Sequence, residues 1–360
     1  MEIENKKRKT RNHEVVALPQ ELIEKILLLL PLKSLVRFRC VSKQWFSMIS
    51  DSHFTKSHFD LAPTTTNDML IYFSPVNSVA RCVDVEESIH RDYAVRIPVT
   101  YEHYALRVRG SCRGFILLLN CVNGTHFVMW NPTTGFHTRV SYPSGLSYPL
   151  WAGVGYDKSS DDYLVVAGWR DRFEKTSNLR HRWEFFSVRN HSWKEIETGD
   201  FHSNHLISCN SGVFCNGAIH WLAVRTVGDS ARVVVAFGLE EKNLSIISLP
   251  DLQGGGTPTL NLLGGYLGIC YTEWQTWRNE LWVLKEYKVE SSWTKLNIDF
   301  PDGFIPMCLT RGSECVGRKN IKELMKFSDK GMLLESRRTS CDIHTIMLMF
   351  ARTLLTLPGQ

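Results

Sequence analysis

The spacing of hydrophobic residues in this chain changes near Pro63. Between residues 18 and 60, apolar side chains recur every three or four positions, which is the period of an α-helix. After Pro63 the apolar residues form short runs of β-branched and aromatic types, separated by Gly, Asn, Asp and Pro. Many short strands joined by turns are typical of an all-β sandwich, barrel or propeller. We therefore predict an α+β chain in which a small three-helix unit precedes an all-β domain.

The helical segment carries more apolar surface than it can bury alone. Its first helix is predicted to begin near Pro19, because a missing N–H costs nothing in the first turn. Pro31 ends this helix, residues 32–42 form a second, and a third begins at Trp45. Domains of about forty residues generally need a staple or a partner to be stable. The excess of exposed Leu and Ile therefore points to a groove on a partner protein.

The β region contains an internal repeat that favours a propeller. Residues 185–196 and 284–296 both read as a strand, a polar turn, a Ser-Trp pair and a second strand. Successive units lie roughly 50 residues apart, which is within the range of kelch-class blades. We predict a propeller-like domain whose blade number this degenerate repeat does not reveal.

The composition excludes several kinds of protein. A basic run at residues 6–11 supplies much of the formal net charge of +5, and we expect residues 1–17 to form a disordered basic tail. A nuclear-import signal or a nucleic-acid arm are the alternatives for this run, but the rest of the chain gives no reason to expect a nucleic-acid partner. The longest apolar run, residues 26–30, is too short to cross a membrane.

The cysteines and the first thirty residues indicate where the chain works. The ten cysteines are scattered without a Cys-x-x-Cys pair, and we find no signal peptide pattern near the start. A reducing compartment follows from both observations. We expect a cytoplasmic location, a nuclear location, or both.

No motif in the chain predicts catalysis. The glycine run at 254–256 is not followed by a lysine-bearing helix, as a phosphate-binding loop would require. His202 and His205 lack a third metal ligand nearby, and the adjacent carboxylates at 161–162 and 240–241 are typical of solvated turns. We therefore predict no catalytic residue, no metal site and no cofactor.

Aromatic and basic residues near the predicted loops are our candidates for binding a partner. Tryptophans inside the strand repeats are expected to fill the core. Tryptophans beside loops over a rigid β scaffold can instead anchor a partner, and one long loop is rich in arginine. The predicted target-binding residues are Trp151, Trp169, Arg170, Arg172, Trp274 and Trp277.

Residues 18–45 resemble the F-box motif. They contain its Leu-Pro opening, the central Leu-Val-Arg-Phe-Arg-Cys-Val-Ser-Lys of residues 35–43 and the closing Trp45. Downstream, the segments 128–135, 153–157, 217–222 and 281–284 resemble the plant F-box-associated domain. The resemblance implies that residues 18–60 are an F-box and residues 61–340 an F-box-associated, kelch-like β domain.

The F-box resemblance also implies partners. Its helices would bind a Skp-type adaptor, which links to cullin and RING subunits, while the β domain would hold an unknown protein target. The residues that match the adaptor contacts of the family are Leu18, Pro19, Leu22, Ile26, Leu27, Leu30, Leu35, Val36, Cys40, Val41 and Trp45. These residues are also apolar positions that the small helical unit is not expected to bury by itself.

The chain departs from the family pattern near its end. From about Ser336 it lacks the Tyr-Asp turn that the family often has near its last strands, so we expect residues 341–360 to be a divergent tail. The function implied is that of a non-catalytic substrate-recognition subunit of an SCF-type (Skp, cullin, F-box) ubiquitin ligase. One alternative is a module that binds the adaptor and sequesters a partner without ubiquitin transfer. Another is a propeller enzyme such as a glycan hydrolase, which would need two convergent carboxylates in one pocket.

Overall fold

The chain divides into two compact units, Met1–Leu61 and Ala62–Gln360, which are considered separately below. The structure is a computed structural model. It describes residues 18–61, 68–73, 79–98, 106–120, 125–143, 146, 149–170, 181–198, 206–207, 211–225, 231–252, 255–273, 275–276, 278–310, 312–320, 322–339 and 346–358. The predicted basic tail, residues 1–17, therefore lies outside the described residues.

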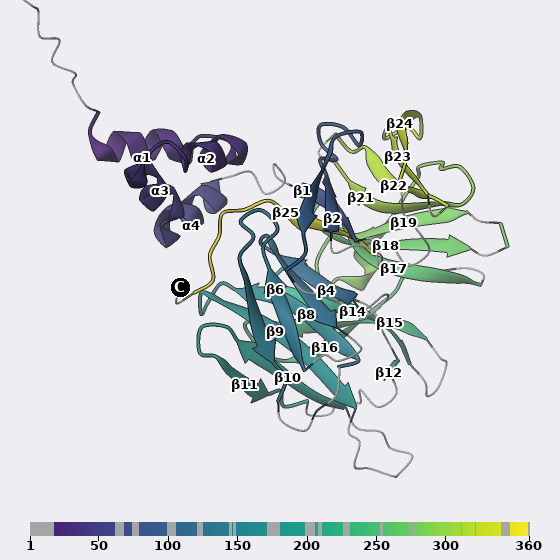
Figure 1. The fold of residues 1–360 in the computed structure, drawn as a ribbon. Helices are drawn as coiled ribbons and strands as arrows, with labels where there is room; N and C mark the ends of the chain where they lie inside the picture. Colours follow the sequence, from purple (N-terminus) through teal and green to yellow (C-terminus); the bar gives the residue numbers. More distant parts are fainter. Residues whose placement is uncertain are drawn as a thin grey trace, which may run out of the picture. The chain divides into compact units, whose positions relative to one another are not determined.

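The first unit contains four helices rather than the predicted three. They are α1 (Gln20–Leu28), α2 (Leu32–Phe38), α3 (Lys43–Ser50) and α4 (Ser52–Leu61), drawn in purple in Figure 1. Asp51 separates the last two helices because its backbone is extended and its carboxylate caps the new helix. Asp51 Oδ1 accepts hydrogen bonds from the backbone N–H groups of His53 at 2.9 Å and Phe54 at 3.1 Å.

The core of the helical unit is small. Its buried hydrophobic residues are Leu27, Leu32, Leu35, Ile49 and Phe54. One buried polar contact joins the last helix to the end of the first, where His58 Nε2 lies 2.9 Å from the carbonyl oxygen of Leu30. The four helices are therefore fixed around a core of only a few side chains.

The second unit is a six-bladed propeller, which confirms the predicted propeller-like fold and supplies the blade number. Each blade is an antiparallel sheet, and the blades are numbered here in chain order. Blade 1 contains β25 (Ile346–Ala351), β1 (Asp68–Phe73), β2 (Val79–Val83) and β3 (Asp92–Arg96). Blade 2 contains β4 (Leu106–Cys112), β5 (Phe115–Asn120), β6 (His126–Trp130) and β7 (His137–Ser141). Blade 3 contains β8 (Trp151–Asp157), β9 (Asp162–Arg170), β10 (His181–Ser187) and β11 (Ser192–Glu195).

The other three blades follow the same pattern. Blade 4 contains β12 (Leu206–Ile207), β13 (Val213–Cys215), β14 (Ala218–Arg225), β15 (Arg232–Gly238) and β16 (Leu244–Ser248). Blade 5 contains β17 (Gly256–Leu263), β18 (Tyr266–Glu273), β19 (Asn279–Leu284) and β20 (Trp293–Leu296), with the 3-10 helix η2 (Glu290–Ser292) before β20. Blade 6 contains β21 (Phe304–Leu309), β22 (Cys315–Lys319), β23 (Glu323–Phe327) and β24 (Leu333–Arg338).

Hydrophobic side chains fill the space between every pair of neighbouring blades, and the ring is closed. Buried contacts join blades 1 and 2, 3 and 4, 4 and 5, 5 and 6, and finally 6 and 1. Between blades 2 and 3 the rings of Phe115 and Tyr163 meet edge to face, with 5.1 Å between their centroids.

The C-terminal strand closes the ring, so residues 346–357 belong to the propeller and the predicted domain boundary at 340 is wrong. β25, yellow in Figure 1, pairs antiparallel with β1, whose Leu70 lies opposite Met349. Beyond β25 the segment from Thr353 to Leu357 contains buried residues, and Asn131 Nδ2 donates to the carbonyl oxygen of Thr353 at 3.2 Å. The domain therefore continues past the predicted boundary at 340. The partner of β25 is almost the whole domain away in sequence, so no local turn signal announces the pairing.

The sequence repeat corresponds to the outer hairpins of blades 3 and 5. In both hairpins a tryptophan on the last strand reaches the preceding blade. Trp193 Nε1 donates to the carbonyl oxygen of Ser141 at 2.7 Å, and Trp293 Nε1 donates to that of Ser248 at 3.0 Å. Ser141 and Ser248 are the final residues of the outer strands of blades 2 and 4. The repeated Ser-Trp pair is therefore a link between blades.

Candidate functional site

The helical unit exposes an apolar surface that exceeds its core. Seven large hydrophobic residues between positions 18 and 46 are exposed, from Val36 at 40% to Leu29 at 82%. They are Leu18, Leu22, Ile26, Leu29, Val36, Val41 and Phe46. Because exposed apolar surface of this density is unusual in a unit so small, it marks a surface for a partner.

The structure separates the predicted adaptor residues into exposed and buried groups. Leu18, Pro19, Leu22, Ile26, Val36, Cys40 and Val41 are exposed, and Leu30 and Trp45 are half-buried. Leu27 and Leu35 are 1% and 0% exposed, so the expectation that the unit leaves them unburied is wrong. The apolar stripe of α1 is wide enough that one edge faces the core of the unit and the other edge faces solvent. Leu22, Ile26 and Leu29 form its outer side at helical spacing, while Leu27 faces the core.

Sequence reasoning missed two exposed residues in this surface. Leu29 continues the spacing of Leu22 and Ile26, a signal that could have identified it. Phe46 is half exposed, and the guanidinium carbon of Arg39 lies 4.9 Å from the centroid of its ring.

Charge around the apolar surface is predominantly basic. Between residues 18 and 50 five basic residues accompany only two acidic ones. They are Lys25, Lys33, Arg37, Arg39 and Lys43, against Glu21 and Glu24. A partner with an apolar groove and an acidic rim would match both the shape and the charge of this surface.

Two of the predicted target-binding residues belong to the propeller core, which corrects that prediction. Trp151 and Trp169 are each 1% exposed. The ring of Trp151 packs against those of Trp183 and Trp221, and Trp169 packs against Trp193. Their strands extend to the positions that the sequence analysis assigned to loops, so both rings lie between sheets.

The other four predicted target-binding residues remain without a structural account. Arg170 ends β9, and the structure does not describe its side chain. Arg172, Trp274 and Trp277 lie outside the described residues. Their role stays a prediction.

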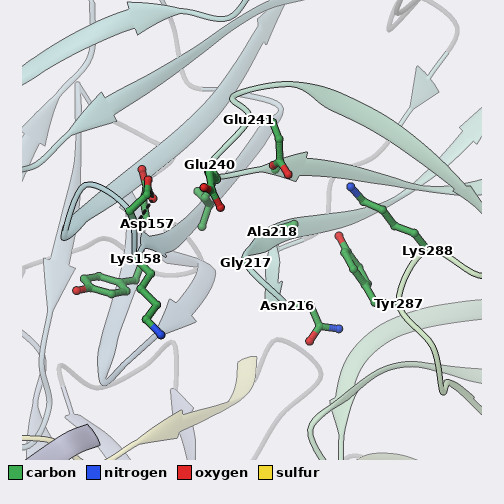
Figure 2. A pocket seen from close by; sticks show the side chains of 13 residues that line it. Asp157, Lys158, Asn216, Gly217, Ala218, Glu240, Glu241, Tyr287 and Lys288 are labelled. Carbon is green, nitrogen blue, oxygen red and sulfur yellow. Dashed lines mark hydrogen bonds between the residues drawn. The ribbon is translucent and has the colours of Figure 1, made fainter.

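The propeller carries a hollow of about 140 Å³ where hairpin turns from three consecutive blades meet (Figure 2). The turn after β8 contributes residues 157–159 from blade 3. Blade 4 contributes residues 216–218 and 238–241 from two turns, and blade 5 contributes Tyr287 and Lys288 from the segment after β19. Tyr156 completes the lining. We call this site the turn-face hollow.

One wall of the turn-face hollow contains an ion pair between Asp157 and Lys242. Asp157 is buried, and its Oδ2 accepts hydrogen bonds from Lys242 Nζ at 2.7 Å and from Ser160 Oγ at 2.6 Å. Its Oδ1 accepts from the backbone N–H and the hydroxyl of Ser159. Burial alone would raise the pKa of Asp157, but these hydrogen bonds lower it well below its ordinary value. Asp157 therefore holds turns together and is not available to a ligand.

The opposite wall is a tyrosine held by a buried histidine. His220 is fully buried, and its Nδ1 lies 3.1 Å from the carbonyl oxygen of Val213, which can only accept. Nδ1 therefore carries the proton, and Nε2 accepts the hydroxyl proton of Tyr287 at 2.9 Å. Burial lowers the pKa of His220 to about 4 and raises the pKa of Tyr287 to about 12. Both groups are neutral at physiological pH, and the Tyr287 oxygen keeps lone pairs for a ligand.

Four charged side chains on the hollow have no ion-pair partner among the residues that the structure describes. They are Lys158, Glu240, Glu241 and Lys288, all exposed. From the sequence alone, the adjacent glutamates are typical of an ordinary solvated turn. No sequence signal could have identified them, because the hollow combines turns that are far apart in the chain.

The described residues contain neither a metal-binding cluster nor a membrane-spanning helix. Three or more His, Cys, Asp or Glu side chains do not come together there in a way that could hold a metal ion. No helix in that part of the chain is long and apolar enough to span a membrane.

Comparison with known proteins matches both units. The model of the F-box domain matches residues 16–57, and that of the F-box associated beta propeller domain matches residues 46–335. The chain is 27% identical over 314 residues to F-box protein CPR1 of Arabidopsis thaliana, covering 78% of this chain and 73% of that protein. It is 29% identical over 298 residues to the F-box/kelch-repeat protein At3g23880 of the same plant, covering 78% of each.

The protein thus joins a small helical module with an exposed apolar surface to a six-bladed β-propeller. The chain belongs to the family of F-box proteins with an F-box associated beta propeller domain.

Proposed function

We propose that this protein is the substrate-recognition subunit of an SCF-type ubiquitin ligase. Its helical unit would dock on a Skp-type adaptor, which brings cullin and RING subunits, and its propeller would hold a protein target. The subunit itself catalyses nothing. It raises the effective concentration of the target near a charged ubiquitin carrier.

The exposed apolar surface of the helical unit is the observation that supports this proposal most directly. That surface contains more large hydrophobic residues than the core that holds the unit together. An apolar groove on an adaptor would remove these residues from water, with a gain of about 25 cal/mol per Å². The membership of the family supports the same partner.

Co-purification with a Skp-type adaptor tests the docking step. Replacing Leu22 and Ile26 together by Asp is expected to abolish the complex, because two carboxylates would enter an apolar interface at a cost of several kcal/mol. Leu333→Asp with Leu334→Asp is a matched control, since both residues are exposed on the propeller. Failure of the unaltered chain to bind the adaptor at micromolar concentration would reject the proposal.

An alternative function involves the same complex but leaves the target without ubiquitin. The protein could hold a target on the adaptor without ubiquitin transfer. Target turnover measured with the full chain and with a chain that lacks residues 18–60 distinguishes the two. Faster turnover that depends on these residues supports the ligase function, while unchanged turnover supports sequestration. We propose that the protein works in the cytoplasm, the nucleus or both.

A further inference from the structure

The turn-face hollow displays an ordered pattern of charge. Following the blades, Lys158 comes from blade 3, Glu240 and Glu241 from blade 4, and Lys288 from blade 5. Figure 2 shows the same order, with the two glutamates between Lys158 on one side and Lys288 on the other. The pattern across the hollow is therefore basic, acidic, acidic, basic.

These charges are not needed to hold the fold together. The turns around the hollow are already fixed by the Asp157 and Lys242 pair and by the His220 and Tyr287 hydrogen bond. Among the described residues, the side chains of Lys158, Glu240 and Glu241 form no hydrogen bond or ion pair. Lys288 only lies over the ring of Tyr287, with 5.6 Å between Nζ and the ring centroid. Rigid walls with uncommitted charges are what a recognition site requires.

The central part of the hollow offers acceptors. The carboxylate of Glu241 folds over Gly238, where an added Cβ would lie 2.4 Å from its Oε2. The hydroxyl oxygen of Tyr287 adds neutral lone pairs beside it, because its proton is donated to His220. A cationic side chain that enters between them would meet hydrogen-bond acceptors and negative charge. Lysines at both ends would repel further cations and attract carboxylates.

We infer that the turn-face hollow binds a peptide segment of a protein target in which basic residues are flanked on both sides by acidic residues. The inference deepens the proposed function and rests on it, because it assigns the target-holding role of the propeller to one place and one kind of segment. The central basic side chain enters the hollow between Glu240, Glu241 and Tyr287. The flanking carboxylates lie against Lys158 and Lys288.

Fluorescence anisotropy with two labelled peptides and the full chain in complex with its adaptor tests the inference. The first peptide is Gly-Asp-Asp-Gly-Lys-Arg-Gly-Asp-Asp-Gly, and the second has every charge reversed. The unaltered protein is expected to prefer the first peptide, with an affinity that falls as salt rises. Glu240→Lys with Glu241→Lys is expected to weaken binding at least tenfold, because like charges then meet.

A charge-exchanged variant gives the decisive result. In this variant Lys158→Glu, Glu240→Lys, Glu241→Lys and Lys288→Glu are combined, which leaves the net charge of the chain unchanged. It is expected to prefer the second peptide. Asp302→Lys with Asp329→Lys serves as the control, since both are exposed acidic residues in loops elsewhere on the propeller, and it is expected to keep the preference of the unaltered protein.

The outcomes separate this inference from the proposed function. No preference in the unaltered protein, or no reversal in the charge-exchanged variant, overturns the inference, and so does an equal loss in the control. These results leave adaptor binding standing. If the chain fails to bind the adaptor, the peptide measurement is made on the chain alone, and a charge-dependent preference there would keep the binding site while the ligase function is rejected.

Discussion

The two units of this protein differ in how much of their apolar surface they bury. In the helical unit eight large hydrophobic residues are exposed and only five hydrophobic residues are buried. In the much larger propeller the described residues include ten exposed large hydrophobic residues, while buried ones fill every junction between blades. The propeller is complete in itself, whereas the helical unit leaves apolar surface for a partner.

This difference indicates where each unit gets its stability. A core of five side chains can balance little of the conformational entropy lost on folding, so we expect the proposed adaptor to stabilise the helical unit when it binds. The propeller depends instead on closure of its ring, because its last strand completes its first blade by antiparallel pairing.

Removal of the closing strand should prevent the propeller from folding. A chain that ends at residue 340 lacks β25, which leaves β1 without a partner on its inner side and exposes the buried Leu70 and Ile71. We expect this loss to be larger than the roughly 5–15 kcal/mol that stabilise a typical domain. We expect no cooperative thermal transition by circular dichroism.

The matched control removes the other unit. A chain that lacks residues 1–61 should retain a cooperative transition close to that of the full chain, because the contact-defined units divide at Leu61. A cooperative transition in the chain that ends at 340 would show that blade 1 does not need β25.

A buried and an exposed residue of the helical unit should respond differently to truncation. Leu35→Ala removes a fully buried side chain and should cost about 2–5 kcal/mol of the stability of this unit. Ile26→Ala lies on the exposed side and should change stability by less than about 0.5 kcal/mol while weakening adaptor binding. Hydrogen exchange over residues 18–61 measures the first effect, and titration with the adaptor measures the second. Equal stability losses in both variants would contradict the division of the helical surface.

The difference between Leu35 and Ile26 also shows what the sequence did not predict, namely which apolar residues of the helices face the core. The change of period near Pro63 predicts both units, because helices and strands bury residues with different spacing. The stripe of α1 spans both sides of the helix, so its width alone could not show that Leu27 faces inward. Trp151 and Trp169 were assigned to loops, but β8 begins at Trp151 and β9 continues through Trp169, so both residues lie within strands.

The candidate target site lay beyond sequence reasoning for a different reason. Glu240 and Glu241 are unremarkable in a turn, and they become part of a site only because blades 3 and 5 place Lys158 and Lys288 beside them. Ring closure could not be predicted from local sequence either, because β25 and β1 are separated by almost the entire propeller sequence. Features that depend on the order of blades around a ring leave no local pattern in the chain.

Acid should weaken the propeller through His220. Its pKa falls from the ordinary value of 6.5 in the unfolded chain to about 4 in the folded protein, because burial disfavours the charged ring. The unfolded chain therefore binds a proton that the folded protein excludes, so this contribution to stability is complete above pH 6.5 and is lost as the pH falls toward 4. We expect a loss of about 2 kcal/mol between pH 7.5 and pH 5.

Urea unfolding followed by tryptophan fluorescence measures this effect, because ten of the eleven tryptophans lie in the propeller. In His220→Gln the loss between pH 7.5 and pH 5 should shrink by about 2 kcal/mol. If the variant and the unaltered protein lose stability equally over this range, another group is responsible for the acid sensitivity.

The links between blades should give the smallest effects. Trp193→Phe and Trp293→Phe each remove one hydrogen bond to the preceding blade while keeping an aromatic ring in place, at a cost of about 1 kcal/mol. Trp282→Phe is the control, since Trp282 Nε1 donates to Glu280 within its own strand, and it should cost less than about 0.5 kcal/mol.

The double variant decides whether these tryptophans act at separate junctions. Trp193 joins blade 3 to blade 2 and Trp293 joins blade 5 to blade 4, so they share no partner and their effects should add to about 2 kcal/mol. A much larger loss in the double variant would mean that loosening one junction weakens the next around the ring. The propeller would then be a cooperative closed ring, in contrast to a helical unit that we expect a partner to stabilise.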